Sequence, residues 1–479
     1  MLLVAIAFNT STEKIIPETK LDMAVDPLGF LARALHLWDG AYFGHLQNQA
    51  YGYLFPMGPF YAAGLNLGME PWTVQRLWMS LVLCTAFLGT VRLAGALRIG
   101  GPYSRLVAGL AYALAPHAQA LIGINSSEFL PTAVLPWILL PLVRGANGDY
   151  SPRRAAALSA VAFLFCGGVN AAAEVAVLAV PILYLLTRRH GRVKRRLIAW
   201  WLPLIALVSL WWVLPLLTLA RYIFSFLPYI ETAGATTSVT TLVNALRGTS
   251  SWLSFLNVDG QTWLPDANQQ ATAPWLIAVT ALLAAAGLAG LARREMRERA
   301  FLLITLLLGV LVVTMGHPGA PQSELLVRLL DGPLAAFRNL HKFDALIRLP
   351  AVLGLAGLLA LVRARWRKPL TGAVAGLVAL SGLPILYAGL APAGGFSAIP
   401  EYWTQAVTWL DRNAGDGMVL AVPGAKRGEY LWGRPLDEPL QSLAQVRWAT
   451  HTIVPWGSAG GSRVMAAIDD RLSSGSGSA

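Results

Sequence analysis

The chain has 479 residues, of which 56% are hydrophobic and only 13% are charged. Soluble domains carry about a quarter charged residues, so this composition excludes a chain folded around one core in water. The net charge of +12 would suit nucleic acid only if it formed one basic face. The Lys and Arg residues lie between apolar runs instead, so we expect no nucleic-acid partner and a lipid bilayer as the surroundings.

Apolar runs close to the length of a membrane-spanning helix recur along the chain. Residues 1–8 are too short to span and suggest either the end of a first helix that begins earlier or a re-entrant end. The stretch 155–187 is too long for one helix, and "CGGVNAAAE" (166–174) interrupts it. We expect an all-α polytopic membrane protein of about 11 transmembrane helices. Besides the N-terminal run, the expected spans are 75–97, 106–123, 129–143, 155–168, 173–187, 197–219, 274–292, 299–316, 346–362 and 369–391.

Basic loops predict the orientation. Loops rich in Lys and Arg face the cytoplasm, and here these are 98–105, 144–154, 187–196, 293–299 and 363–368. The opposite face then holds the long first loop, 9–74, and everything after 391. This pattern predicts a multi-pass plasma-membrane protein with its active site on the extracytoplasmic face. The loop 187–196 would also suit an acidic cytoplasmic partner, although topology alone accounts for its charge.

The composition changes near the C-terminus. We expect residues 1–391 to form the transmembrane module and 392–479 to begin a soluble extracytoplasmic α/β domain. Residues 399–413 have apolar side chains at helical spacing, and 417–424 are typical of a buried strand. No closing element is evident after them, so we expect the domain to be truncated.

The first loop contains two carboxylates in "TKLDMAVDP" (19–27). Asp22 and Asp26 lie four residues apart, and a proline after Asp26 favours an extended backbone there. The two side chains are therefore not expected to share a helical face.

Residues 26–46 show apolar side chains at helical spacing and predict an amphipathic helix on the membrane surface. Arg33 and His36 would either face water on this helix or contact a sugar. Four further candidates for sugar or acceptor binding in the loop are Asp39, His45, Tyr51 and Tyr53.

Polar residues also occur where spans begin. Glu128 and Glu174 would either stabilise helix N-termini or bind substrate, since charge within an apolar run is costly and usually functional. The stretch 337–350 ("FRNLHKFDALIRLP") places cations on the outer side, against the orientation rule. They predict either a phosphate site or anchoring to lipid headgroups. These residues are Arg338, His341, Lys342 and Arg348.

Together these features suit a lipid-linked sugar. Aromatic walls stack on sugar rings, cations stabilise the leaving phosphate and a carboxylate accepts a proton from the acceptor hydroxyl. A single displacement needs one base rather than the acid–base pair of a hydrolase.

Two stretches carry a resemblance to a known family. Residues 11–62, beginning "STEKIIPETKLDMAVDP", together with 337–350, resemble the actinobacterial α-(1→3)-arabinofuranosyltransferase D family. These enzymes have the GT-C fold, and the resemblance extends over the whole chain as the N-terminal membrane module. It implies transfer of arabinofuranose, with inversion, from decaprenylphosphoryl arabinose to the arabinan of arabinogalactan and lipoarabinomannan.

The resemblance also implies residue roles. Asp22 matches the base of the first outer loop, with Asp26 in reserve, and a divalent cation at either acid is permitted. The phosphate-binding roles in 337–350 rest on position and charge. The alternatives are a GT-C polyprenyl-phosphate mannosyltransferase, a transporter or flippase of lipid-linked sugars, and a glycan-binding scaffold without catalysis.

Overall fold

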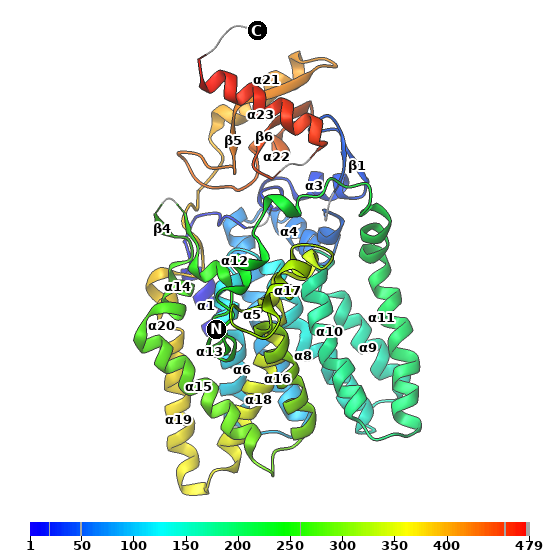
Figure 1. The fold of residues 1–479 in the computed structure, drawn as a ribbon, viewed down its shortest axis with the longest axis vertical. Coiled ribbons are helices and arrows are strands. Elements are labelled where there is room, and N and C mark those ends of the chain that lie inside the picture. The colour runs from blue at the N-terminus through cyan, green and yellow to red at the C-terminus, as the bar shows by residue number, and fades with distance from the viewer. Residues whose placement is uncertain (19, 48–49, 259, 455–456, 476–479) are drawn as a thin grey trace. The chain divides into compact units, whose positions relative to one another are not determined.

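The computed structural model describes the chain except for residues 19, 48–49, 259, 455–456 and 476–479 (Figure 1). The described residues form two compact units. Unit 1 comprises Met1–Thr10, Met79–Leu210 and Thr232–Leu390, and unit 2 comprises Ser11–Trp78, Trp211–Glu231 and Ala391–Ala479. The first loop therefore belongs to the same unit as the C-terminal residues.

Two long helices pass from one unit to the other along the chain, α5 (Pro71–Ala96) and α11 (Arg192–Leu219). The remaining helices of unit 1 are α1 (Leu2–Asn9), α6 (Pro102–Ala113), α7 (Pro116–Leu121), α8 (Ser126–Ala146), α9 (Pro152–Leu164), α10 (Ala171–Thr187), α12 (Ala233–Thr237), α13 (Leu242–Arg247), α14 (Pro265–Thr272), α15 (Pro274–Ala292), α16 (Arg299–Thr314), α17 (Ser323–Leu330), α18 (Ala345–Leu361), α19 (Ala364–Ser381) and α20 (Leu383–Ala388). Three 3₁₀ turns, η3 (Trp252–Phe255), η4 (Ala335–Phe337) and η5 (Leu340–Asp344), and the hairpin β3 (Asn257–Val258) with β4 (Gln261–Thr262) complete it.

Several helices have the length and apolar composition needed to cross a membrane. In the described part of the chain there are six: α5, α8, α11, α15, the segment Leu340–Leu361 and the segment Ala364–Ala388. The helices α10 and α16 are apolar but shorter. The fold class predicted from the apolar runs, an all-α polytopic membrane protein, is confirmed.

One predicted span was wrong. The run 106–123 is not one helix, because α6 ends at Ala113 and α7 begins at Pro116. Proline lacks an amide hydrogen and disfavours helical backbone at the preceding residue, so the helix breaks there. The run 369–391 falls largely within the candidate span Ala364–Ala388, in which α19 and α20 follow one another. The predicted break between 155 and 187 is confirmed, since α9 and α10 are separate.

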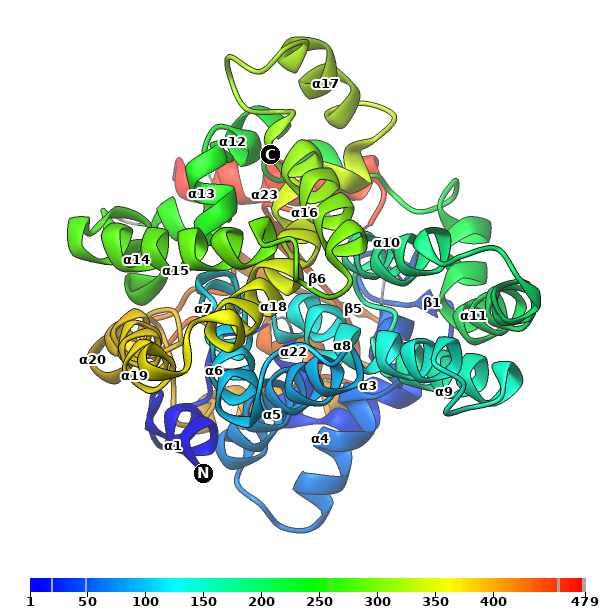
Figure 2. The same ribbon diagram turned by 90° about the horizontal axis from the view of Figure 1, so that it is seen from below.

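Helix α18 is one of the most enclosed helices of unit 1. Every residue from Ala345 to Gly357 is buried, and α6, α15 and α16 pack around it (Figure 2). Glycines permit the close approach of α15, because a methyl group on Gly290 would overlap the carbonyl oxygen of Gly354. Small residues that let backbones approach are the usual means of packing helices in a membrane.

Unit 2 combines short helices with a small sheet. Its strands β5 (Met418–Lys426) and β6 (Arg447–Thr452) pair in parallel. Its other elements are α2 (Asp22–Val25), α3 (Pro27–Ala34), β1 (Trp38–Asp39), β2 (His45–Leu46), η1 (Ala50–Leu54), α4 (Met57–Asn66), η2 (Leu227–Tyr229), α21 (Glu401–Asn413), α22 (Pro439–Leu443) and α23 (Ala459–Ser473). A core of Tyr42, Val407, Leu440, Trp448 and Met465 joins the early and late parts of the chain.

The predicted helix over 26–46 was wrong. Only α3 is helical, and the chain then forms the hairpin β1–β2. The Asp39 carboxylate accepts a hydrogen bond from the Ala41 amide, and Gly44 takes a positive φ of 85°, which glycine adopts without strain. Turn chemistry thus ended the helix despite the helical spacing of the apolar residues.

The predictions for the C-terminal residues were better. The amphipathic helix expected at 399–413 is α21, and the strand expected at 417–424 is β5. The strand is not buried, because Leu420 and Val422 are both 43% exposed. The helix α23, which packs on β5 and β6, was not anticipated.

Candidate functional site

Asp22 is the most enclosed carboxylate of unit 2. It begins α2, and its side chain is fully buried, with 0% exposed. Oδ1 accepts a hydrogen bond of 2.5 Å from the Arg33 guanidinium, and Oδ2 accepts one of 2.7 Å from the side-chain amide of Gln441. Both oxygens are therefore held by donors from different parts of unit 2.

The surroundings of Asp22 raise the pKa of its carboxyl group above the ordinary value. The pKa of Asp22 is raised from its ordinary 3.8 to about 6, because burial and the nearby Asp437 raise it by more than Arg33 and Lys20 lower it. Asp437 is itself held by the Leu21 amide at 3.0 Å and by Lys20 at 3.4 Å. A carboxylate with a pKa of about 6 is mostly ionised at neutral pH yet a stronger base than an ordinary aspartate, as general-base catalysis requires.

Asp26 lies in different surroundings. Its backbone is not helical, and its carboxylate caps α3 by accepting a hydrogen bond of 2.9 Å from the Gly29 amide. Its side chain is 43% exposed and lies 3.8 Å from the Arg33 guanidinium. Arg33 thus contacts both acids and is not simply a solvated side chain, whereas His36 is exposed.

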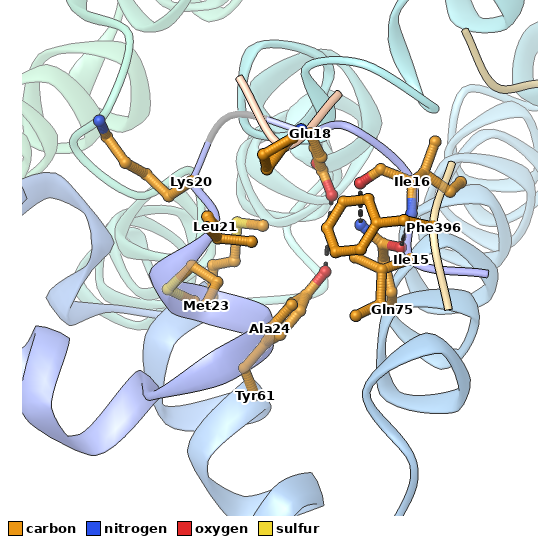
Figure 3. Close-up of a pocket in the computed structure, with 12 residues that line it drawn as sticks. Ile15, Ile16, Glu18, Lys20, Leu21, Met23, Ala24, Tyr61, Gln75 and Phe396 are labelled. Atoms are coloured by element: carbon orange, nitrogen blue, oxygen red, sulfur yellow. Dashed lines mark hydrogen bonds between the residues drawn. The ribbon is translucent and has the colours of Figure 1, made fainter. Parts of the chain in front are cut away.

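A small pocket lies beside α2 (Figure 3), and hydrogen bonds around it hold the segment that carries Asp22 in place. The Tyr61 hydroxyl donates to Glu18 at 3.5 Å, and the Gln75 side chain exchanges two hydrogen bonds with the backbone of Ile16, at 2.9 and 3.1 Å. The pocket holds only about 10 Å³, enough for about one water. It is too small for a sugar, so these contacts position Asp22 rather than bind substrate.

The other candidates of the first loop are structural in this arrangement. Asp39 supports the hairpin turn, and His45 Nδ1 lies 3.2 Å from the Ala41 carbonyl oxygen. Tyr51 and Tyr53 are 5% and 3% exposed in η1. The structure does not bring these four side chains to Asp22.

Glu128 is the centre of a polar cluster in unit 1. It lies in the first turn of α8, where Asn125 caps the helix and also donates to Glu128 Oε2 at 3.3 Å. His341 Nε2 lies 3.1 Å from Oε1, and Lys342 Nζ lies 3.3 Å from Oε2. Asn170, which caps α10, donates to Oε2 at 3.0 Å and accepts from Lys342 at 3.3 Å. Glu128 therefore acts at a helix start and also binds the two central cations of 337–350.

The two arginines of that stretch are engaged elsewhere. Arg348 pairs with Asp344 at 2.9 Å and donates to the carbonyl oxygens of Ala245 and Leu246 at the end of α13. Arg338 is 4% exposed and lies 4.0 Å from Asp331. Every cation of the predicted phosphate site thus has an acidic neighbour, and only His341 and Lys342 share one.

Glu174 is buried, with 1% exposed, in the first turn of α10. Neither of its carboxylate oxygens has a hydrogen-bond partner among the described residues. The same holds for Nδ1 of His117, whose ring lies 6.0 Å from that of His341. Buried polar atoms without partners are rare and mark places where a ligand or water donates or accepts.

The residues present do not fit a divalent cation at Asp22 or Asp26. A guanidinium occupies one oxygen of Asp22, and an amide nitrogen occupies the other. No group of three or more His, Cys, Asp or Glu residues converges to hold a metal within the part of the chain that the structure describes.

Sequence reasoning missed Gln441, Asp437, Asn125 and His117. Gln441 and Asp437 lie in "LDEPLQS" (436–442), which carries no feature that separates it from an ordinary turn and helix start. Asn125 had a usable signal, because Asn three residues before an acid is typical of a helix N-terminus.

Some basic side chains of the loop after α10 already have partners inside unit 1. Arg188 forms an ion pair with Glu298, and Lys194 donates to the carbonyl oxygens of Leu186 and Arg188. These contacts do not support the binding of an acidic partner at this loop.

The apolar spans define a polytopic membrane protein, and comparison with known proteins gives its GT-C class and its family. The family model described as alpha-(1->3)-arabinofuranosyltransferase, N-terminal GT-C domain, matches residues 2–479, so the chain belongs to this family. The resemblance predicted from residues 11–62 and 337–350 is thereby confirmed.

Curated relatives agree. The chain is 40% identical over 476 residues to the alpha-(1->3)-arabinofuranosyltransferase of Mycolicibacterium smegmatis, covering 94% of this chain and 33% of the relative. It is 40% identical over 480 residues to that of Mycobacterium tuberculosis, covering 94% of this chain and 34% of the relative. The chain thus spans about a third of the length of these relatives.

A solved structure confirms the fold. The cryo-EM structure of the arabinofuranosyltransferase AftD from Mycobacteria matches with a TM-score of 0.79 and 39% identity, covering 95% of this chain and 31% of that chain.

Proposed function

We propose that this chain is the catalytic membrane module of an α-(1→3)-arabinofuranosyltransferase that uses decaprenylphosphoryl arabinose as donor and cell-wall arabinan as acceptor. The observation that carries the proposal is the buried Asp22, whose pKa is raised to about 6 and whose oxygens both accept hydrogen bonds. The family match supports the sugar and the linkage.

Asp22 is the base of the acceptor half of the reaction. The oxygen of the acceptor hydroxyl attacks the anomeric carbon of the donor arabinose, and its proton passes to Asp22 Oδ2. In the structure, the Gln441 amide N–H donates to this oxygen. The O–H group of the acceptor would replace Gln441 as its hydrogen-bond donor. Arg33 holds Oδ1 and keeps the carboxylate ionised at neutral pH.

The donor half of the reaction falls to the cluster around Glu128. As the new glycosidic bond forms, the bond between the anomeric carbon and the phosphate oxygen breaks, and the polyprenyl phosphate leaves with the electron pair. Lys342 and His341, set in place by Glu128, would stabilise the growing charge on the phosphate. Arg348 and Arg338 act in positioning, since their guanidinium groups are engaged by Asp344 and Asp331.

Glu174 is proposed to accept hydrogen bonds from sugar hydroxyls. Both of its oxygens are buried without a partner among the described residues, and a hydroxyl-rich ligand supplies the missing donors. We further propose that Asp22 works on the extracytoplasmic face, because the basic loops favour that orientation.

The test is a transfer assay with the protein in membranes. Radiolabelled polyprenyl-phosphate arabinose and polyprenyl-phosphate mannose are offered with a synthetic arabinan, and the product is analysed for a 1→3 linkage. Incorporation of arabinose alone supports the proposal. Incorporation of mannose alone, or movement of the lipid-linked sugar across the membrane without transfer, would contradict it.

The orientation is tested separately. His36 is exposed, so a His36→Cys variant should react in intact cells with a thiol reagent that does not cross the membrane. Reaction only after the cells are opened would reverse the proposed topology.

A further inference from the structure

A basic groove in unit 1 lies apart from both polar clusters described above. It has a volume of about 720 Å³ and opens where α5 ends, α6 begins and α8 ends. Four arginines line it, Arg92, Arg98, Arg105 and Arg144, together with a single acid, Asp149. It thus belongs to the end of the helices that carries the basic loops 98–105 and 144–154.

No ion pair among the residues that the structure describes neutralises the charge of these arginines. In the regions described, none of the four forms an ion pair with a carboxylate. Arg105 donates to the Ile99 carbonyl oxygen at 2.9 Å, and Arg144 donates to the Tyr150 hydroxyl at 2.5 Å. Each of these two contacts involves a single nitrogen and leaves other N–H donors of the guanidinium available.

Topology alone requires positive charge at this end but no concave site. The loop after α15 shows the difference, because Arg293 and Arg294 are exposed there and do not line this groove. Converging guanidinium groups are suited to phosphate, which they bind through paired hydrogen bonds.

An apolar track leads to the groove. Leu81 and Leu88 are 47% and 46% exposed on α5, and the spacing of seven and then four residues puts them on the same face as Arg92. Leu106, on the wall formed by α6, is 43% exposed. The two helices approach closely at Gly109, where a Cβ atom would lie 2.8 Å from Val91.

We propose that this groove binds the phosphate headgroup of an anionic phospholipid. The acyl chains would lie along Leu81 and Leu88, and the phosphate would lie among the arginines. A free phosphate ion would use the same charges but would gain nothing from the apolar track. Basic pockets between membrane helices are the usual sites for such headgroups.

The experiment uses the purified protein in a neutral detergent and counts bound lipid by native mass spectrometry. The probes are phosphatidylglycerol and phosphatidylcholine, with glycerol 3-phosphate as the chain-free anion. The test variant is Arg92→Gln with Arg98→Gln, both exposed positions. The matched control is Arg293→Gln with Arg294→Gln, which removes the same charge from a basic loop outside the groove.

We expect the unmodified protein to retain phosphatidylglycerol in preference to phosphatidylcholine. The test variant should bind phosphatidylglycerol roughly tenfold or more weakly, with an unchanged thermal midpoint, while the control variant binds it normally. If both variants lost phosphatidylglycerol binding equally, the binding would depend on general surface charge and not on the groove, and the proposal would be overturned. Displacement of the lipid by millimolar glycerol 3-phosphate would show a free-anion site and would also overturn it.

Discussion

The side-chain amide of Gln441 donates a 2.7 Å hydrogen bond to Oδ2 of Asp22, a residue 419 positions earlier in the chain. Arg33 holds the other oxygen at 2.5 Å. The carboxylate is therefore kept buried and ionisable by one cation and one neutral donor. The neutral donor is the one that an acceptor hydroxyl can replace, because removing it leaves the ion pair intact.

The first prediction concerns Asp22 as base. Asp22→Asn should lower arabinose transfer by about 10²–10⁴-fold, the usual contribution of a general base. The affinity for the lipid-linked donor should change little, because the amide preserves the shape of the side chain. Single-turnover transfer and equilibrium donor binding measure the two effects.

Asp26→Asn is the matched control for this variant. Asn caps helices as well as Asp does, so α3 should keep its N-terminus and transfer should fall only slightly. A loss as large as that of Asp22→Asn would show that Asp26 is the base.

The second prediction is the pH profile of transfer. Because the pKa of Asp22 is about 6, the base is protonated below that pH, and the rate should rise as pH increases through about 6. Arg33 lowers this pKa, so Arg33→Gln should move the rise to a pH about one unit higher or more. Arg427→Gln, at an exposed position of unit 2, is the control and should leave the pH profile unchanged. If both variants shifted the profile equally, the net charge and not the ion pair with Arg33 would determine the pKa of Asp22.

The same pKa predicts how stability depends on pH. The folded pKa of about 6 is above the ordinary 3.8, so the folded state binds this proton more tightly than the unfolded state does. The resulting stabilisation is present below about pH 4 and is lost as pH rises through 6. It amounts to about 3 kcal/mol at 1.36 kcal/mol for each pH unit. Thermal midpoints at pH 4.5 and 7.5 should therefore differ more in the unmodified protein than in Asp22→Asn, and equal differences would contradict the assignment.

The third prediction separates a binding cation from a structural one. Lys342→Gln should weaken donor binding by roughly 10- to 100-fold with a smaller effect on folding, because Glu128 keeps its contacts with His341, Asn125 and Asn170. Arg348→Gln should instead destabilise the fold by about 3–5 kcal/mol, since it leaves the buried Asp344 unpaired. Donor titration and thermal unfolding distinguish these results. An unchanged donor affinity in Lys342→Gln would favour anchoring to headgroups.

The fourth prediction concerns the unpartnered carboxylate of Glu174. Replacing it by Gln should raise the KM of the sugar substrate roughly tenfold, because the amide puts an NH2 group, which cannot accept a hydrogen bond from a sugar hydroxyl, in place of one carboxyl oxygen. The thermal midpoint should stay the same or rise, since a buried carboxylate costs more than a buried amide. A normal KM together with a higher midpoint would leave Glu174 without a role in binding.

The fifth prediction tests the helix packing. Gly290→Ala should destabilise unit 1 by about 1–3 kcal/mol, as overpacking commonly does, because the added methyl group overlaps the Gly354 carbonyl oxygen. Gly376→Ala on α19 is the matched control, since nothing lies within 4 Å of a Cβ atom there. Thermal unfolding in detergent measures both, and equal midpoints would contradict the close approach of α15 and α18.

Local patterns predicted most helices correctly and some of the site. The apolar runs predicted α10 and α15 nearly to the residue and α8 to within three residues at each end, because a segment that must satisfy its backbone in lipid becomes helical. The same reasoning failed over 26–46, where turn residues after Ala34 had a stronger effect than helical spacing. Within the site, the importance of Asp22 and Glu128 was visible from the unusual position of charge in an apolar chain.

The sequence did not predict which residues bind these charged side chains. Arg33 was expected to face water or a sugar, and Gln441 carried no signal at all, yet both bind Asp22. Arg338, Arg348 and Lys342 looked equivalent in sequence, but each lies beside a different acid: Asp331, Asp344 and Glu128.

The sequence by itself therefore determined that this is a polytopic helical membrane protein of the arabinofuranosyltransferase family, since apolar length and local motifs suffice for both. Only the tertiary structure decided which acids and cations are paired, which oxygens are left without donors and which arginines share a groove. Some of those outcomes depend on packing between residues far apart in the chain, such as Asp22 with Gln441 and Glu128 with His341. Their energies come from burial and short polar contacts, which no local pattern encodes.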